Sequence, residues 1–200
     1  MKHHWLRGIL LGMCLGLLVA SGAAVAQPAE PDKNSEALFE VNAPPLSPFL
    51  EIRVDNRPNT RPRVAYSTRR DEFLVVWEEQ IHGGEIAIYG RRIGGNGSLT
   101  TPAFPIWHQP NQQHTLPDVA YCPKSDNYLV AWTYKHSATD YDIHARLVRG
   151  TGQPLNHIFV DVDTNWDWYP AVACSTRDDE FLVVYEKYIG NTRRDIEAQR

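Results

Sequence analysis

The sequence predicts an all-β protein made of tandem four-stranded antiparallel blades, a partial β-propeller of about three repeats. Three observations support this prediction: an internal repeat with a period of about 54 residues, short apolar strands inside each copy, and turn residues between those strands. Repetition at this period is typical of folds in which each copy is one supersecondary unit that buries its faces against its neighbours. No window shows a helical period.

The repeat opens with a strand of the form Pro-x-Val-Ala. Its copies, at 62–67, 117–122 and 170–175, lie 55 and then 53 residues apart. A second strand follows each of them, at 71–78, 126–133 and 179–186. Phe73-Leu74-Val75-Val76-Trp77 is apolar at both parities, so both faces of this strand are expected to be covered, as in stacked blades.

Two further strands complete a copy. A third strand recurs at 88–93, 143–148 and 196–200, and glycine-rich turns at 94–97 and 150–152 lead into a fourth. We place the fourth strand near Phe104-Pro105-Ile106 and, in the second copy, near Phe159-Val160-Asp161. The copies therefore span about 62–116, 117–169 and 170–200, and the last lacks its fourth strand. Residues 50–55 are expected to form a strand that could complete the last blade.

This pattern resembles repeats of secreted bacterial proteins that form β-propellers. The shared motifs are Pro-x-Val-Ala-Tyr, Asp-Glu-Phe-Leu-Val-Val-Trp and Ile-Tyr-Gly-x-Arg, and the resemblance covers residues 62–200. It implies a propeller and an address outside the cytoplasm. It implies no particular activity, because propellers host binding, scaffolding and catalysis alike.

The N-terminus predicts export. A basic start is followed by about a dozen apolar residues and by Ala24-Val25-Ala26, so residues 1–26 are expected to be a signal peptide cleaved after Ala26. The alternative is an uncleaved membrane anchor, which the short apolar run and the polar residues after it disfavour. We expect a secreted, periplasmic or cell-surface protein with no membrane span after cleavage, a flexible leader at 27–49 and a repeat domain at 50–200.

The charge balance excludes nucleic acid as a partner. Cleavage would remove only Lys2 and Arg7 among the charged side chains, leaving 18 basic and 24 acidic ones. Such an acidic chain has no basic face to neutralise phosphates. Nor does any basic amphipathic helix predict binding to a membrane surface.

Cys122 and Cys174 are the only cysteines after residue 26, in a compartment that permits disulfides. They lie in the first strands of adjacent copies at positions of opposite parity, which allows a bridge between stacked blades. The alternative is two small buried thiols whose Cα atoms lie beyond the roughly 7 Å limit for bridging. The sequence leaves both interpretations open.

One loop has the oxygen-ligand spacing of a calcium site. Asp161, Asp163, Asn165 and Asp167 alternate along 161–167, and calcium prefers carboxylate and carbonyl oxygens on a tight loop. However, Trp166 stands where the turn glycine belongs, and Val172 stands where the twelfth-position acid belongs. An ordinary polar loop is the alternative, and no other cofactor is indicated.

Aromatic residues that do not repeat are the better binding candidates, because loops on a rigid scaffold carry function. Trp107, Trp166 and Trp168 are expected in connecting segments, where a flat ring could hold a sugar; packing between blades is the alternative. The histidines lack metal-ligand spacing and are assigned no metal. We find no catalytic residues, since the paired acids at 71–72 and 179–180 recur beside a hairpin turn.

The sequence therefore predicts an exported propeller module that binds or scaffolds an extracellular protein or glycan. The alternative is part of a glycoside hydrolase or lyase whose catalytic acids lie outside this chain. Three blades cannot close a ring, because propellers usually have four to eight blades. We expect either a longer propeller or, if the chain is complete, a homodimer of six blades driven by exposed apolar faces on the first and third copies.

Overall fold

The computed structural model describes residues 49–190 and 192–200, and every regular element among them is a β-strand. The eleven strands are β1 (Asn59–Ser67), β2 (Glu72–Gln80), β3 (Ile86–Gly94), β4 (Phe104–Trp107), β5 (Gln113–Cys122), β6 (Asn127–Lys135), β7 (Tyr141–Arg149), β8 (Pro154–Asp161), β9 (Trp166–Ser175), β10 (Glu180–Ile189) and β11 (Arg193–Gln199). This part of the chain contains no helix long and apolar enough to span a membrane. The predicted signal peptide at 1–26 and leader residues 27–48 lie outside the described residues.

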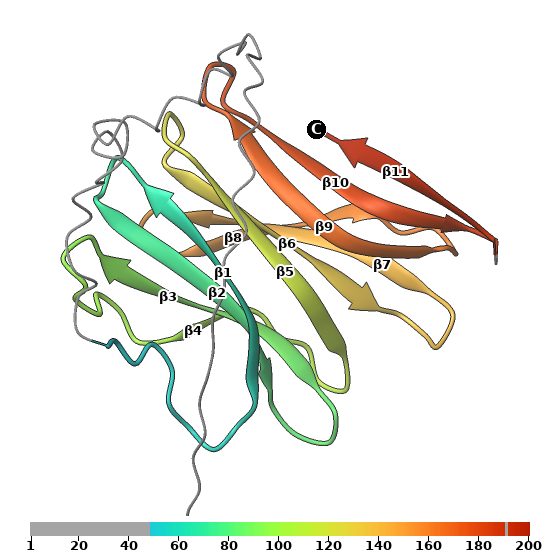
Figure 1. Ribbon diagram of the computed structural model, residues 1–200, viewed down its shortest axis with the longest axis horizontal. Helices are drawn as coiled ribbons and strands as arrows, with labels where there is room; N and C mark the ends of the chain where they lie inside the picture. The colour runs from blue at the N-terminus through green and yellow to red at the C-terminus, as the bar shows by residue number, and fades with distance from the viewer. Residues whose placement is uncertain (1–48, 191) are drawn as a thin grey trace, which may run out of the picture. The chain divides into compact units, whose positions relative to one another are not determined.

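The strands form three antiparallel meanders, which confirms the predicted fold class, a partial β-propeller. In chain order the blades are β1–β4, β5–β8 and β9–β11. Single parallel bridges, between Ile86 and Gln113 and between Tyr141 and Trp166, join each blade to the next. In space the first strand β5 contacts both β1 and β9, so the three first strands lie side by side and the blades fan outward from them (Figure 1).

Each first strand begins earlier than its proline motif predicts. The residue before the proline has a positive φ in all three copies: Arg61 at 51°, Leu116 at 55° and Tyr169 at 53°. The strand register shifts at the same place, so a β-bulge absorbs the proline, which cannot donate a ladder hydrogen bond. The strand then continues upstream of the bulge to residues 59, 113 and 166.

Apolar residues of both parities on the second strands form the blade interfaces, as predicted. Leu74 and Val76 of β2 pack against Val130 and Trp132 of β6, and the opposite face of β6 packs through Leu129 and Ala131 against Val183 and Tyr185 of β10. Gly90 lies at the first interface, where a Cβ atom would come within 3.1 Å of Ile106. Stacked blades thus cover both sides of the central blade.

The outer face of the first blade differs from the prediction. Residues 50–55 form no strand and do not complete the last blade. Instead Ile52 packs on Val75, Trp77 and Ile93, which are all less than a tenth exposed. This segment substitutes for a neighbouring blade, so the expected exposed face of copy one is wrong. On the third blade, by contrast, Leu182 is 40% exposed and Ile196 is 73% exposed, so the second strand and its neighbour stay uncovered there.

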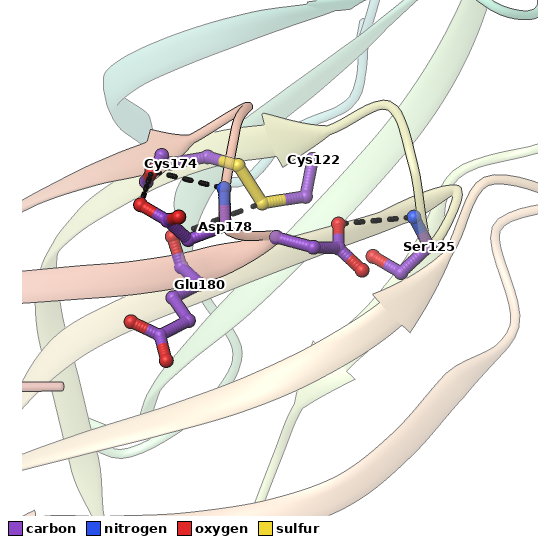
Figure 2. Close-up of a disulfide and its surroundings, with 7 residues drawn as sticks. Cys122, Ser125, Cys174, Asp178 and Glu180 are labelled. Carbon is purple, nitrogen blue, oxygen red and sulfur yellow. Dashed lines mark hydrogen bonds between the residues drawn. A yellow bond between two sulfur atoms is a disulfide. The ribbon is translucent and has the colours of Figure 1, made fainter.

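A disulfide links the second and third blades. The Cα atoms of Cys122 at the end of β5 and Cys174 in β9 lie 5.6 Å apart, within bridging range, and the two sulfur atoms are bonded (Figure 2). Beside it, the Ser125 amide donates to Asp179 of the next hairpin. Arg70 pairs with Asp126 at the equivalent position one blade earlier. The hairpin tips of successive blades are therefore tied by one repeated polar contact and, once, by a covalent bond.

Candidate functional site

A cleft of about 830 Å³ lies at the end of the second blade. It lies where the loops β4–β5, β6–β7 and β8–β9 meet. Its lining comprises Trp107, Gln109, Gln112, Tyr134, His136, Asp140, Asp142, His144, His157, Phe159, Val162, Asp163 and Thr164. Aromatic rings, imidazoles and carboxylates thus share one surface, a composition suited to a ligand with both apolar faces and hydroxyl groups.

Phe159 is the exposed ring of this cleft, at 61%. The repeat aligns Phe159 with Phe104, which packs partly buried against the core, but the strand register places Phe159 one position further along. Gly90 pairs with Phe104 whereas the equivalent Ala145 pairs with Ile158, so Ile158 takes the inward position. Because successive side chains on a strand point to opposite faces, this one-residue difference turns Phe159 outward.

The three tryptophans predicted as binding residues lie in strands rather than in connecting segments. Trp107 ends β4 and lines the cleft, but His157 stacks on its ring at 4.2 Å and the Arg146 guanidinium carbon lies 5.2 Å from its centre. Trp166 begins β9, is 37% exposed and lines a smaller hollow of about 470 Å³ with Asn165 and Tyr188. Trp168 packs on Tyr141 at 4.3 Å. Only Trp107 belongs to the cleft.

Asp142 is the buried carboxylate of the cleft. Burial raises the pKa of Asp142 to about 6, and the negative charge of Asp140 adds to this effect. The ring nitrogens His136 Nδ1 and His144 Nε2 lie 3.8 and 3.9 Å from its Oδ2 atom. Asp142 can therefore exchange a proton near neutral pH, which is a property found at functional sites.

A cluster of imidazoles extends from the wall of the cleft, formed by His144 and His157, to the fully buried His114. Trp132 Nε1 donates a hydrogen bond of 3.1 Å to Nδ1 of His114, which is fully buried. His144 Nδ1 and His157 Nε2 share a hydrogen bond of 3.2 Å. Burial, with repulsion from neighbouring histidines, lowers the pKa of His114 to about 3 and that of His144 to about 4. These rings are uncharged at neutral pH and act as flat polar packing groups.

Of the four residues predicted to bind calcium, the three aspartates converge, and Asn165 hydrogen-bonds to one of them, Asp163. Carboxylate oxygens of Asp161, Asp163 and Asp167 all lie within 4.8 Å of one another. Asn165 donates through its backbone and its side chain to Asp163. Burial, together with the charge of Asp161, raises the pKa of Asp167 to about 7.

A lysine of the neighbouring strand joins this acidic cluster. Lys187 Nζ lies 2.7 Å from Asp161 Oδ2 and 2.6 Å from Asp163 Oδ2. Burial alone would lower the pKa of Lys187, but hydrogen bonds to these two carboxylates outweigh it and raise the pKa. The cluster thus attracts positive charge, and the lysine supplies one unit of it.

Sequence reasoning missed Asp142, His144, His157 and Phe159. Asp142 occupies the repeat position of the buried Ala87 in the first copy and of Asp195 in the third. Because an acid recurs at this position in two of the three copies, the repeat did not mark Asp142 as an exception. Phe159 carried no signal either, because its direction depends on a register shift that the sequence does not display.

Comparison with known proteins bears on the fold. No protein-family model matches the chain, and no curated protein matches it in sequence. Among solved structures it is similar to a thermostable family-43 glycoside hydrolase, with a TM-score of 0.51 and 13% identity, over 74% of this chain and 55% of that one. An endo-arabinase from Bacteroides thetaiotaomicron gives a TM-score of 0.49, 9% identity and coverage of 74% and 57%. An alpha-L-arabinofuranosidase from Lactobacillus brevis gives 0.47, 14% identity and coverage of 75% and 54%.

The chain thus spans a little over half the length of each of these structures. At 13% identity the first similarity shows a shared propeller architecture and nothing about activity.

Proposed function

We propose that this chain is an exported propeller module that binds a glycan in the cleft at the end of the second blade. The observation that carries the proposal is the exposed Phe159 ring beside three carboxylates, Asp140, Asp142 and Asp163, in one hollow. A sugar ring offers an apolar face that stacks on an aromatic side chain and hydroxyl groups that donate to carboxylates. Export is part of this proposal and follows from the N-terminal sequence.

A glycan array tests this function first. Affinity electrophoresis of the mature chain follows, in gels that contain the polysaccharides identified on the array. Phe159→Ala should weaken retention about tenfold, since an aromatic contact contributes roughly 0.5–1.5 kcal/mol beyond its buried area. Val64→Ala is the matched control, because Val64 is 59% exposed on β1 and does not line the cleft. An empty array, or equal weakening by both variants, would overturn the proposal.

A second candidate is a contribution to glycoside hydrolysis. Asp142 favours it, because a carboxyl group that holds its proton to about pH 6 can act as a general acid. Of the three solved structures, the one with the highest TM-score is named a glycoside hydrolase. Its support for hydrolysis is limited to the shared architecture. Release of reducing sugar from a polysaccharide that the chain binds would favour hydrolysis over binding alone, provided that Asp142→Asn abolishes the release and leaves binding intact. Retention without any release supports the binding module.

A further inference from the structure

The end of β8 and the start of β9 bring three carboxylates into one small volume. Asp161 is the last residue of β8, Asp167 is the second residue of β9, and Asp163 lies in the loop between them. Their oxygens, mutually within 4.8 Å, have the spacing of ligands around a single cation. An acidic cluster of this kind also arises in ordinary loops, so the state of its individual members decides what it can bind.

Asp167 is the member that an ordinary loop does not explain. It is fully buried, and neither of its carboxylate oxygens has a hydrogen-bond partner. Unpartnered buried carboxylates are costly, and most buried polar groups are hydrogen-bonded. Asp167 also points at the other two acids, since its oxygen is one of the three that converge.

The repeat shows why Asp167 lacks a donor. In the first two blades the equivalent side chain accepts a hydrogen bond from the tryptophan of the second strand: Trp77 donates to Asn59, and Trp132 donates to His114. In the third blade the tryptophan is replaced by Tyr185, whose hydroxyl donates to Asp161 instead. An acid therefore stands where the other copies hold a neutral acceptor, and its usual donor is directed elsewhere.

Lys187 neutralises only part of the negative charge of the three aspartates, and its ammonium group has an alternative partner in Glu197. Its ammonium group contacts Asp161 and Asp163, and no hydrogen bond joins it to Asp167. Glu197 Oε2 lies 3.3 Å from the same Nζ atom, and that side chain is 42% exposed. The ammonium group can therefore turn toward Glu197 and solvent while keeping one carboxylate partner.

From these observations we infer that Asp161, Asp163 and Asp167 form a binding site for a hard divalent cation, calcium in the first place, which displaces the ammonium group of Lys187. All three ligands are carboxylates, which hard cations prefer, and calcium tolerates the irregular geometry of a strand end better than magnesium does. The cation would supply the partner that Asp167 lacks. Asp163 belongs to both this site and the glycan cleft, whereas Asp161 and Asp167 do not line the cleft.

Terbium luminescence tests the site in the exported chain, because Tb³⁺ replaces calcium and is excited by nearby tryptophans. Trp166 and Trp168 flank Asp167 in sequence and supply the excitation. We expect sensitised emission that calcium quenches by competition at about 1 mM or below, the range of extracellular calcium modules. Asp167→Asn should weaken calcium at least tenfold, and Lys187→Met should tighten it because the competing ammonium group is removed. Asp195→Asn is the control, since this acid on β11 pairs with Arg193 outside the cluster.

Calcium competition that Asp167→Asn retains undiminished overturns the site, because Asp167 is then not a ligand. Competition by calcium that is lost in Asp167→Asn and retained in Asp195→Asn supports the site. No binding to the unmodified chain overturns it, and binding to Lys187→Met alone overturns it as well, because the lysine is then the resident cation. Circular dichroism of each variant confirms that it has folded. Glycan retention with and without calcium is measured separately, so that failure of one proposal leaves the other tested.

Discussion

Replacing His114 with asparagine should make the protein less sensitive to acid. In the folded state Nδ1 of His114 accepts the Trp132 Nε1 hydrogen bond, so the ring must be neutral there. Adding a proton would place two donors face to face inside a fully buried site. Asparagine can do the same work, since Asn59 accepts from Trp77 at the equivalent position of the first blade.

The sign follows from the lowered pKa of His114, about 3 in the folded protein. The unfolded chain takes up a proton near pH 6.5, so acid favours unfolding from that pH downward until the folded ring also titrates. Between about pH 7.5 and about pH 5, the wild type should lose about 2 kcal/mol of unfolding free energy through this one residue. The raised pKa values of Asp142 and Asp167 act in the opposite direction, but they are common to both proteins and cancel in the difference.

Urea unfolding of the two proteins across this pH range measures the difference. At neutral pH His114→Asn should be the less stable protein, because a smaller side chain leaves a gap beside Tyr134, which stacks on the imidazole at 5.1 Å. As the pH falls, the difference in unfolding free energy between the wild type and His114→Asn should decrease by about 2 kcal/mol. His82→Asn, on an exposed loop, provides the control and should show a constant difference. A constant difference for His114→Asn as well would contradict the explanation.

Repetition made the fold predictable, and local exceptions made the site hard to predict. All three copies keep apolar residues at the same five consecutive positions of the second strand, so its two-sided burial in stacked blades could be read directly from Phe73 to Trp77. Bulges before Pro62, Pro117 and Pro170 could not, because the positive φ of the preceding residue comes from tertiary pairing rather than from a glycine. The covering of the first blade by Ile52 was equally hidden, since a single isoleucine in an irregular segment has no periodicity to reveal it.

The candidate site follows the same logic. The convergence of Asp161, Asp163 and Asp167 was visible as alternating oxygen ligands along one loop. The lysine that contacts two of them was not, because Lys187 reaches the cluster from β10, twenty or more residues away, as the cross-strand partner of Asp167. Tryptophans were visible as binding candidates, yet their availability depends on which faces are already covered. His157 covers Trp107, and the exposed ring proved to be Phe159.

Removing the disulfide should produce the second large effect. Cys122 and Cys174 are 52 residues apart in sequence, and they join the second blade to the third. Closing a loop of this length restricts the unfolded chain by about 4 kcal/mol in the loop-entropy treatment, of which real proteins commonly realise 2–4 kcal/mol. We expect Cys122→Ser with Cys174→Ser to lower the unfolding free energy by about that amount. Ser67 holds the position of Cys122 in the first blade, so serine fits the local backbone there.

The design that isolates the cross-link compares both single variants, the double variant and the reduced wild type in urea. All four should lose the same stability relative to the oxidised wild type, because either substitution breaks the one bond and the second adds nothing. Peptide mapping without reductant should recover Cys122 and Cys174 in one linked fragment. Additive losses in the single variants, with no response of the wild type to reductant, would mean that the two cysteines act as separate packing groups. In the proteins that lack the bond, the third blade should open first. Its outer side chains Leu182 and Ile196 are exposed, and no bond holds its hairpin to the second blade.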